Sequence, residues 1–323
     1  MPDARNRTHP TRGPRAHTLK VCAACATAAL AASLAACTPS GPPARTQHPS
    51  VRAAAPAHGP APRAKRGATL ARALKPLLPE GDTRLAVAVL DLDSADQEVA
   101  SYGAKEAFDT ASISKVGILA ALLLQAQDED RKLTAAERAN AEQMIRASDN
   151  DAANTLWQTI GQAEGLDAAH TRLGLKATQG GPGTRWGLTQ TTAKDQVQLL
   201  RAVFTREPAS SPHPPNGLNQ TSRAYIHQLM DHIAHDQDWG VSAAGSPGSH
   251  WALKNGWVQR STTGLWVINS TGQISVHGHR YLISVLSSGN PTMKSGITLV
   301  EHAARAAIGA ATTHARPWPK QNP

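Results

Sequence analysis

The chain has 323 residues, a formal net charge of +9 and an aromatic content of only 4%. Its first 68 residues carry ten of the 33 Lys and Arg residues but one of the 24 acidic residues, so 23 residues of each sign remain beyond position 68. The basic excess therefore does not indicate nucleic-acid binding, because the remaining part is neutral and shows no interleaved basic and aromatic residues.

The N-terminus has the layout of a secretory signal, in which a basic stretch precedes a short apolar run and small residues. The run ends in LAAC (34–37), which resembles the lipobox of bacterial lipoproteins; the alternative is an ordinary cleaved signal. We expect residues 1–37 to be a lipoprotein signal peptide, with Cys37 lipidated at the outer face of the bacterial cytoplasmic membrane. Loss of Cys22 and Cys25 with the signal would leave no partner for an intramolecular disulfide.

A Pro- and Ala-rich segment follows at residues 38–68, with no acidic residue and no apolar period. This composition predicts a disordered tether. Residues 69–315 then form one domain of ordinary size, long enough to bury a core.

Apolar periodicity places helices and strands along this domain. Helices are expected at 68–78, 115–127, 134–146, 152–160, 163–175, 191–204, 222–235 and 295–308. Strands are expected at 84–93, 97–104, 249–258, 264–270, 273–278 and 279–288. Two separated strand blocks around a helical middle predict an α+β layer fold.

Ser112 and Lys115 lie three residues apart, where a very apolar helix begins. Residues at this spacing share one helix face, so Ser112 can meet Lys115 and Ser114 cannot comfortably do so. A buried lysine with a lowered pKa can activate a serine nucleophile. The alternative is that Ser112 caps the helix and Lys115 reaches solvent.

Two further motifs could carry chemistry. Ser148-Asp149-Asn150 precedes a helix, so its residues could be ordinary caps, or a proton carrier and a substrate-amide ligand. Lys254-Asn255-Gly256 lies between apolar runs, so it could be a hairpin turn, or a strand with a cation for a substrate carboxylate.

Histidines near Asp231 in the sequence give only weak evidence for a metal site. His227, His232 and His235 lack a metal-binding signature, and we expect them to lie on an exposed helix face, as we expect His277 and His279 to lie at a turn. We expect no metal and no cofactor.

The motifs S-x-x-K, S-D-N and K-x-G, in this order, are typical of class A β-lactamases and penicillin-binding proteins. Over residues 69–310 the chain resembles this serine β-lactamase and D,D-peptidase superfamily, close to its class A branch. The resemblance implies an antiparallel sheet of about five strands flanked by helices, with an all-helical subdomain.

The resemblance also implies roles for the motif residues. Ser112 would be the acylated nucleophile, Lys115 its base and Ser148 the proton shuttle. Substrate would be bound by Asn150, Lys254, Asn255, Gly256 and Trp257, with the backbone N–H groups of Ser112 and Trp257 as the oxyanion hole.

The chain departs from the family at several points. Asn255 replaces a threonine, Trp257 is bulky for a strand that lines a site, and the loop between Lys115 and Ser148 is short. Class A enzymes also carry a glutamate in an omega loop that activates the deacylating water, but residues 168–194 contain no Asp or Glu. The resemblance therefore implies acylation followed by slow deacylation.

We expect a monomeric, membrane-anchored serine hydrolase that acts on β-lactams or D-Ala-D-Ala cell-wall peptides. One alternative is a non-catalytic envelope binding protein with the same fold. Another is an esterase or amidase with a different acyl substrate.

Overall fold

A computed structural model describes residues 62–78, 81–205 and 217–313, all within one compact unit that spans residues 57–323. The predicted signal peptide, Cys37 and most of the predicted tether lie outside these residues. Residues 62–68, predicted to belong to the tether, are instead part of helix α1 (Pro62–Leu74). Proline is favoured at a first helical position, because its φ angle is already suitable and its missing N–H is not needed there.

A five-stranded antiparallel sheet forms the centre of the fold and confirms the predicted α+β class. In spatial order its strands are β2 (Ala100–Tyr102), β1 (Arg84–Asp91), β7 (His279–Asn290), β6 (Trp266–Val276) and β5 (Trp251–Gln259). A separate pair, β3 (Phe108–Asp109) and β4 (Gln190–Thr191), joins two loops beside the sheet. Strand β5 lies at the end of the sheet order, so half of its backbone polar groups point away from the sheet.

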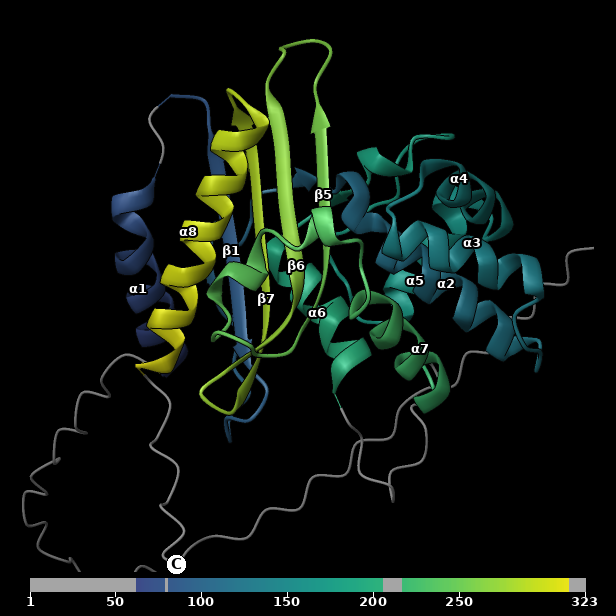
Figure 1. Cartoon of the computed structure of the whole chain (residues 1–323), viewed down its shortest axis with the longest axis horizontal. Helices are drawn as coiled ribbons and strands as arrows, with labels where there is room; N and C mark the ends of the chain where they lie inside the picture. Colours follow the sequence, from purple (N-terminus) through teal and green to yellow (C-terminus); the bar gives the residue numbers. More distant parts are fainter. Residues whose placement is uncertain (1–61, 79–80, 206–216, 314–323) are drawn as a thin grey trace, which may run out of the picture. The chain divides into compact units, whose positions relative to one another are not determined.

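Helices cover the sheet on both faces (Figure 1). Helix α1 and helix α8 (Met293–Thr312) pack on one face and on each other. The other helices are α2 (Ser114–Asp128), α3 (Ala135–Arg146), α4 (Asn150–Thr159), α5 (Gln162–Arg172), α6 (Ala193–Phe204) and α7 (Gln220–Met230). Helix α6 packs on β1 and β7, and α2 contacts α3, α4, α5 and α7, which form the all-helical part.

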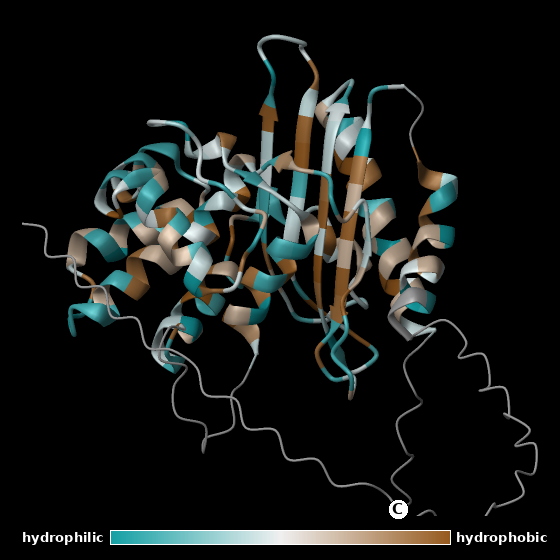
Figure 2. Cartoon of the chain, turned by 180° about the vertical axis from the view of Figure 1, so that it is seen from behind, coloured by the Kyte–Doolittle hydropathy of each residue, from teal (hydrophilic) through white to brown (hydrophobic). Residues whose placement is uncertain are grey.

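Two hydrophobic cores result from this arrangement. In strand β1, Leu85, Val87 and Val89 face the core under α1 and α8, and the alternate residues Ala86, Ala88 and Leu90 face the core of the helical part. Figure 2 shows the hydrophobic colouring that runs along the central strands between the two helical layers. None of the helices in the described ranges is long and apolar enough to cross a membrane.

One continuous strand replaces the two strands predicted at 264–270 and 273–278. Gly272 lies inside β6, opposite Leu253 on β5 and Ile283 on β7. A Cβ atom at Gly272 would lie 2.4 Å from the carbonyl oxygen of Ala252, so glycine here allows close strand packing and does not mark a turn.

Helix α7 ends at Met230, although the prediction extended it to residue 235. The chain then turns toward α3, and the N–H of Ala234 donates a hydrogen bond to the carbonyl of Arg146. His232 and His235 therefore lie beyond the helix and do not share a helix face. His277 and His279 flank the β6–β7 turn, as predicted.

Candidate active site

Ser112 lies in a one-turn 3-10 helix, Ala111–Ile113, that leads from β3 into α2. Ala111 has a left-handed backbone with φ of 46°, which turns the chain sharply before the serine. The Ser114 hydroxyl donates to the carbonyl of Ala111 at 2.9 Å, so it is occupied by the backbone. Of the two serines, Ser112 is the one that lines a pocket.

Lys115 is fully buried, which excludes the alternative of a solvent-facing lysine. Its Nζ donates hydrogen bonds to Ser148 O at 2.7 Å, to Ser148 Oγ at 3.2 Å and to Asn150 Oδ1 at 2.9 Å. Burial lowers the pKa of Lys115 to about 7, against an opposing effect of the Asp149 carboxylate. Near neutral pH this amine can therefore accept a proton.

The Ser148-Asp149-Asn150 motif serves as a helix cap and also faces the site. Asp149 is the N-cap of α4 and accepts a hydrogen bond from the N–H of Ala152 at 2.7 Å. Ser148, just before it, has a φ of 55°, an uncommon conformation for a residue other than glycine. This backbone directs both the carbonyl and the hydroxyl of Ser148 to the Lys115 amine.

Lys254 approaches the same hydroxyl from strand β5. Its Nζ donates to Ser148 Oγ at 2.9 Å and to the carbonyl of Asn255 at 3.0 Å. Burial lowers the pKa of Lys254 well below its ordinary value, and the nearby Lys115 lowers it further. The motif lies in the middle of β5, so the structure excludes the alternative that residues 254–256 form a hairpin turn.

Gly256 packs directly against the turn that carries the nucleophile. A Cβ atom here would lie 2.7 Å from the carbonyl oxygen of Thr110 and 2.8 Å from the backbone nitrogen of Ser112. The absence of a side chain thus lets β5 approach the Ser112 backbone.

Asn255 is buried and directed away from the pocket. Its Nδ2 donates to the carbonyls of Gln237 and Trp239, at 2.8 and 2.9 Å. Asn255 therefore links strand β5 to the segment 237–239 through two hydrogen bonds.

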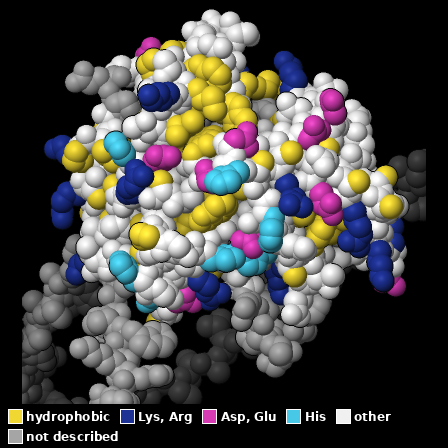
Figure 3. All heavy atoms as spheres, in the orientation of Figure 1, with side chains coloured by type: hydrophobic (Ala, Val, Ile, Leu, Met, Phe, Trp, Pro, Cys, Tyr) yellow, Lys and Arg dark blue, Asp and Glu magenta, His cyan; other side chains and the backbone are white. Residues whose placement is uncertain are grey.

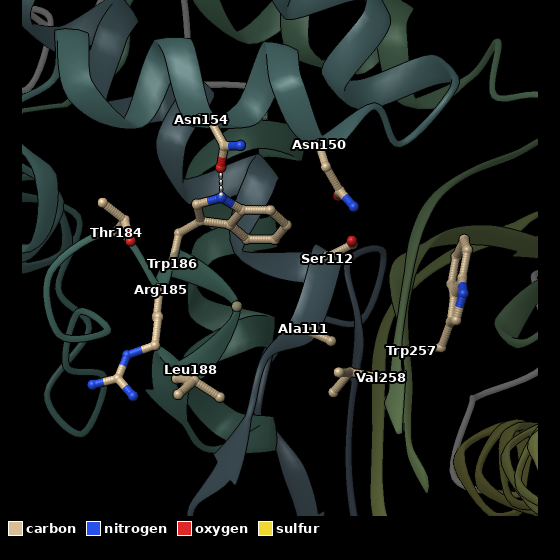
Figure 4. Close-up of a pocket in the computed structure, with 11 residues that line it drawn as sticks. Ala111, Ser112, Asn150, Asn154, Thr184, Arg185, Trp186, Leu188, Trp257 and Val258 are labelled. Carbon is tan, nitrogen blue, oxygen red and sulfur yellow. Dashed lines mark hydrogen bonds between the residues drawn. The ribbon is translucent and has the colours of Figure 1, made fainter. Parts of the chain in front are cut away.

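Ser112 opens onto a pocket with a volume of about 370 Å³ (Figure 4). The lining residues are Ala111, Ser112, Asn150, Asn154, Thr184, Arg185, Trp186, Gly187, Leu188, Trp257 and Val258. The two tryptophans lie on opposite sides of Ser112, and the Ser112 hydroxyl points toward Asn150. The pocket thus collects the predicted residues Ser112, Asn150 and Trp257, with Lys115, Ser148 and Lys254 hydrogen-bonded beside it.

Trp186 is a site residue that the sequence motifs did not predict. Its ring centroid lies 4.7 Å from Lys115 Nζ, and its Nε1 donates to Asn154 Oδ1 at 2.8 Å. It belongs to a Gly-rich loop, QGGPGTRWG (179–187), whose composition indicated only a connection between helices. A single tryptophan in an otherwise small and polar loop was the signal available in the sequence.

Acidic side chains near this loop have structural roles. Asp167 accepts a hydrogen bond from the N–H of Gly180 at 2.6 Å, and Asp195 accepts from Thr178 Oγ1 and from the N–H groups of Lys176 and Ala177. None of the described residues that line the pocket is Asp or Glu.

Histidines gather on one face of the molecule (Figure 3). His250 Nε2 lies 2.9 Å from Asp231 Oδ1, and the rings of His227 and His250 are 6.1 Å apart. Over the described ranges, no group of three or more His, Cys, Asp or Glu residues could hold a metal ion.

Comparisons with known proteins agree with the α+β fold described above. The model of the β-lactamase enzyme family matches residues 69–139 and 137–313. No curated protein sequence matches the chain.

Solved structures with the same fold have low sequence identity to the chain. The TLA-1 extended-spectrum β-lactamase is 15% identical, with a TM-score of 0.64 over 77% of this chain and 99% of the other. A class A β-lactamase from Bacteroides cellulosilyticus is 16% identical, with a TM-score of 0.62 over 79% and 100%. A point mutant of PBP-A, solved as an acyl-enzyme complex with penicillin G, is 20% identical, with a TM-score of 0.61 over 77% and 97%.

Proposed function

The chain belongs to the β-lactamase enzyme family, and we propose that it is a serine acyl-transfer enzyme that forms an acyl-enzyme at Ser112. Its substrates are β-lactams or the D-Ala-D-Ala ends of cell-wall peptides. The observation that carries the proposal is the convergence of Lys115 and Lys254 on the Ser148 hydroxyl, beside a pocket lined by Ser112.

Acylation begins when Ser112 Oγ attacks the substrate carbonyl carbon and its proton passes to the neutral amine of Lys115. The C–N bond then breaks, and Ser148 gives its proton to the leaving nitrogen. Ser148 regains a proton from Lys115, so the Ser112 proton ends on the leaving amine and both lysines return to their starting state. The hydrogen bonds from both lysines to Ser148 Oγ support this relay.

The backbone N–H groups of Ser112 and Trp257 are proposed to hold the oxyanion of the tetrahedral intermediate. Two observations support this role. Gly256 brings β5 against the Ser112 backbone, and β5 lies at the end of the sheet order, which leaves outward-facing N–H groups.

The same set of residues supports slow deacylation as part of the proposal. Hydrolysis of the ester needs a base that activates water, and the described pocket lining contains no carboxylate. Asp167 and Asp195 accept backbone hydrogen bonds in the loop and are not available for this role.

We propose that the enzyme lies outside the cell, attached through lipidated Cys37 to the outer face of the cytoplasmic membrane. The signal-like order of residues 1–37 supports this location. We propose that it acts as a monomer.

An esterase or amidase activity on another acyl substrate is a second candidate. The side-chain amide of Asn255, at the position where the family has a carboxylate-binding hydroxyl, is directed to Gln237 and Trp239. Substrates without a carboxylate would not be affected by this change. A panel of neutral p-nitrophenyl esters, compared with penicillins at equal concentration, separates the two candidates.

Intact-mass measurement after incubation with penicillin G tests the acyl-enzyme. We expect one adduct with the mass of the whole penicillin, because ring opening releases no fragment. Ser112→Ala should gain none, and Ser114→Ala is the matched control that should still be acylated. No adduct on the wild type, or an equal adduct on Ser112→Ala, would reject the proposal.

A further inference from the structure

Trp186 forms one wall of the pocket and also faces the buried amine of Lys115. The ring centroid lies 4.7 Å from Lys115 Nζ. The amine makes its hydrogen bonds to Ser148 and Asn150, and the face of the indole ring covers it within cation-π distance. Lys115 is fully buried, although Trp186 itself is only partly buried.

The loop that carries Trp186 is fixed at several points, so the indole has a defined position. Trp186 Nε1 donates a hydrogen bond to Asn154 Oδ1 on α4. Before Trp186 in the loop, the carbonyl of Gly183 accepts a hydrogen bond from Trp157 Nε1 at 2.8 Å. On the other side of Trp186, the N–H of Thr110 donates to the carbonyl of Thr189 at 2.8 Å. The last contact joins the loop to the segment that leads into Ser112.

We propose that Trp186 is a positioning residue that covers the Lys115 amine, keeps it dry for proton acceptance from Ser112 and keeps water away from it after acylation. The second part of this inference rests on the proposed acyl-enzyme. Because no acidic side chain is present in the described pocket lining, Lys115 is the base that a hydrolytic water would have to reach, and the indole lies against it.

The ionisation of Lys115 supports this role. The charged groups that act on it are the Asp149 carboxylate at the start of α4 and Lys254 on β5. Desolvation outweighs the Asp149 carboxylate and lowers the pKa of Lys115 to about 7. Removal of the indole would take away a ring face that attracts the ammonium, but it would also admit water to the amine. Desolvation is the larger of the two effects, so hydration of the amine should favour the ammonium form.

The first test follows the titration of Lys115 by NMR in protein labelled with ¹³C-lysine, with the signal assigned by its loss in Lys115→Met. We expect Trp186→Ala to raise the midpoint by about one pH unit and Trp186→Phe, which keeps a ring, to stay near the wild type. Trp257→Phe, on the opposite wall, is the matched control and should not move the midpoint. An unchanged midpoint in Trp186→Ala overturns the proposed cover.

The second test measures the lifetime of the penicillin G adduct by intact mass after removal of free penicillin. Trp186→Ala should lose its adduct several-fold faster than the wild type and Trp186→Phe; an equal or longer lifetime overturns water exclusion. If the wild type forms no adduct, the proposed acyl-enzyme fails, and the NMR titration still decides whether Trp186 covers Lys115.

Folding is monitored by thermal melting of each variant. Should Trp186→Ala not fold, Asn154→Ala frees the indole nitrogen and leaves the ring in the chain. We expect Asn154→Ala to shift the Lys115 midpoint in the same direction by a smaller amount, and a midpoint equal to that of the wild type overturns the inference.

Discussion

Lys254 on strand β5 donates a hydrogen bond of 2.9 Å to the hydroxyl of Ser148, which lies 106 residues earlier in the chain. The same oxygen lies 3.2 Å from Nζ of Lys115, so two buried amines share one hydroxyl. Burial lowers the pKa of both amines, and two ammonium groups this close would also repel each other. The site therefore favours at least one neutral amine.

The rate of acylation should rise with pH and level off above about pH 7. Lys115 has a pKa lowered to about 7, so below this pH the amine is protonated and cannot accept the Ser112 proton. We expect roughly a tenfold loss of rate per pH unit well below the midpoint. Stopped-flow or quenched measurement of acylation by a fluorescent penicillin from pH 5 to 9 gives the profile, and a flat profile would contradict the role of Lys115.

Ser148→Ala should lower the acylation rate by about 10² to 10⁴, because the leaving nitrogen loses its proton donor. Lys115 keeps its hydrogen bonds to the carbonyl of residue 148 and to Asn150, so the variant should fold. Ser148→Gly is the matched control: it also lacks the hydroxyl but suits the φ of 55°. It should be equally slow and about 1 kcal/mol more stable than Ser148→Ala. Equal activity of Ser148→Ala and wild type would exclude the proton relay.

Asn255→Ala should lower the free energy of unfolding by about 1 to 3 kcal/mol, because the carbonyls of Gln237 and Trp239 lose their donor in a buried place. Urea unfolding followed by circular dichroism measures this change. Gln259→Ala, on an exposed position of the same strand, should change stability by no more than about 0.5 kcal/mol. An unchanged free energy of unfolding in Asn255→Ala would show that the two hydrogen bonds do not stabilise the fold.

His170 should make the protein sensitive to acid. It is buried beside Gly117 of α2, and burial lowers its pKa to about 4, against an opposing effect of Asp195. The unfolded chain binds a proton near pH 6.5, but the folded chain does so only near pH 4. The contribution of His170 to the free energy of unfolding is therefore fully present above about pH 6.5. It falls by about 3 kcal/mol as the pH drops to about 4.

Urea unfolding of wild type and His170→Gln at pH 7 and pH 4.5 tests this loss. We expect a smaller decrease in the free energy of unfolding for His170→Gln, because glutamine has no group that titrates between pH 7 and pH 4.5. His302→Gln, on an exposed part of α8, should keep the decrease of the wild type. The same decrease in all three proteins would mean that His170 is not the acid-sensitive group.

Local patterns in the sequence were sufficient for much of the fold. The segment 115–127, apolar on almost every side, predicted a buried helix, and alternating residues predicted β1 and β7, because these periods report directly which faces are buried. The prediction failed where packing overrode a local signal. Gly272 sits within β6 because neighbouring strands need its missing side chain, and α7 stops at Met230 because the following chain bonds to α3.

The three motifs can be read from the order of residues alone, and helical spacing predicts Ser112 rather than Ser114 as the partner of Lys115. Three other features depend on the packing of the whole domain: Lys115 and Lys254 meet at Ser148, Asn255 is directed away from the pocket, and Trp186 lies against Lys115. The physical reason is the separation of these residues along the chain. Helical spacing predicts contacts only between residues three or four positions apart. The contacts around Lys115 join segments 33 to 71 residues away from it, and these positions depend on how the sheet, α4 and the Gly-rich loop pack together.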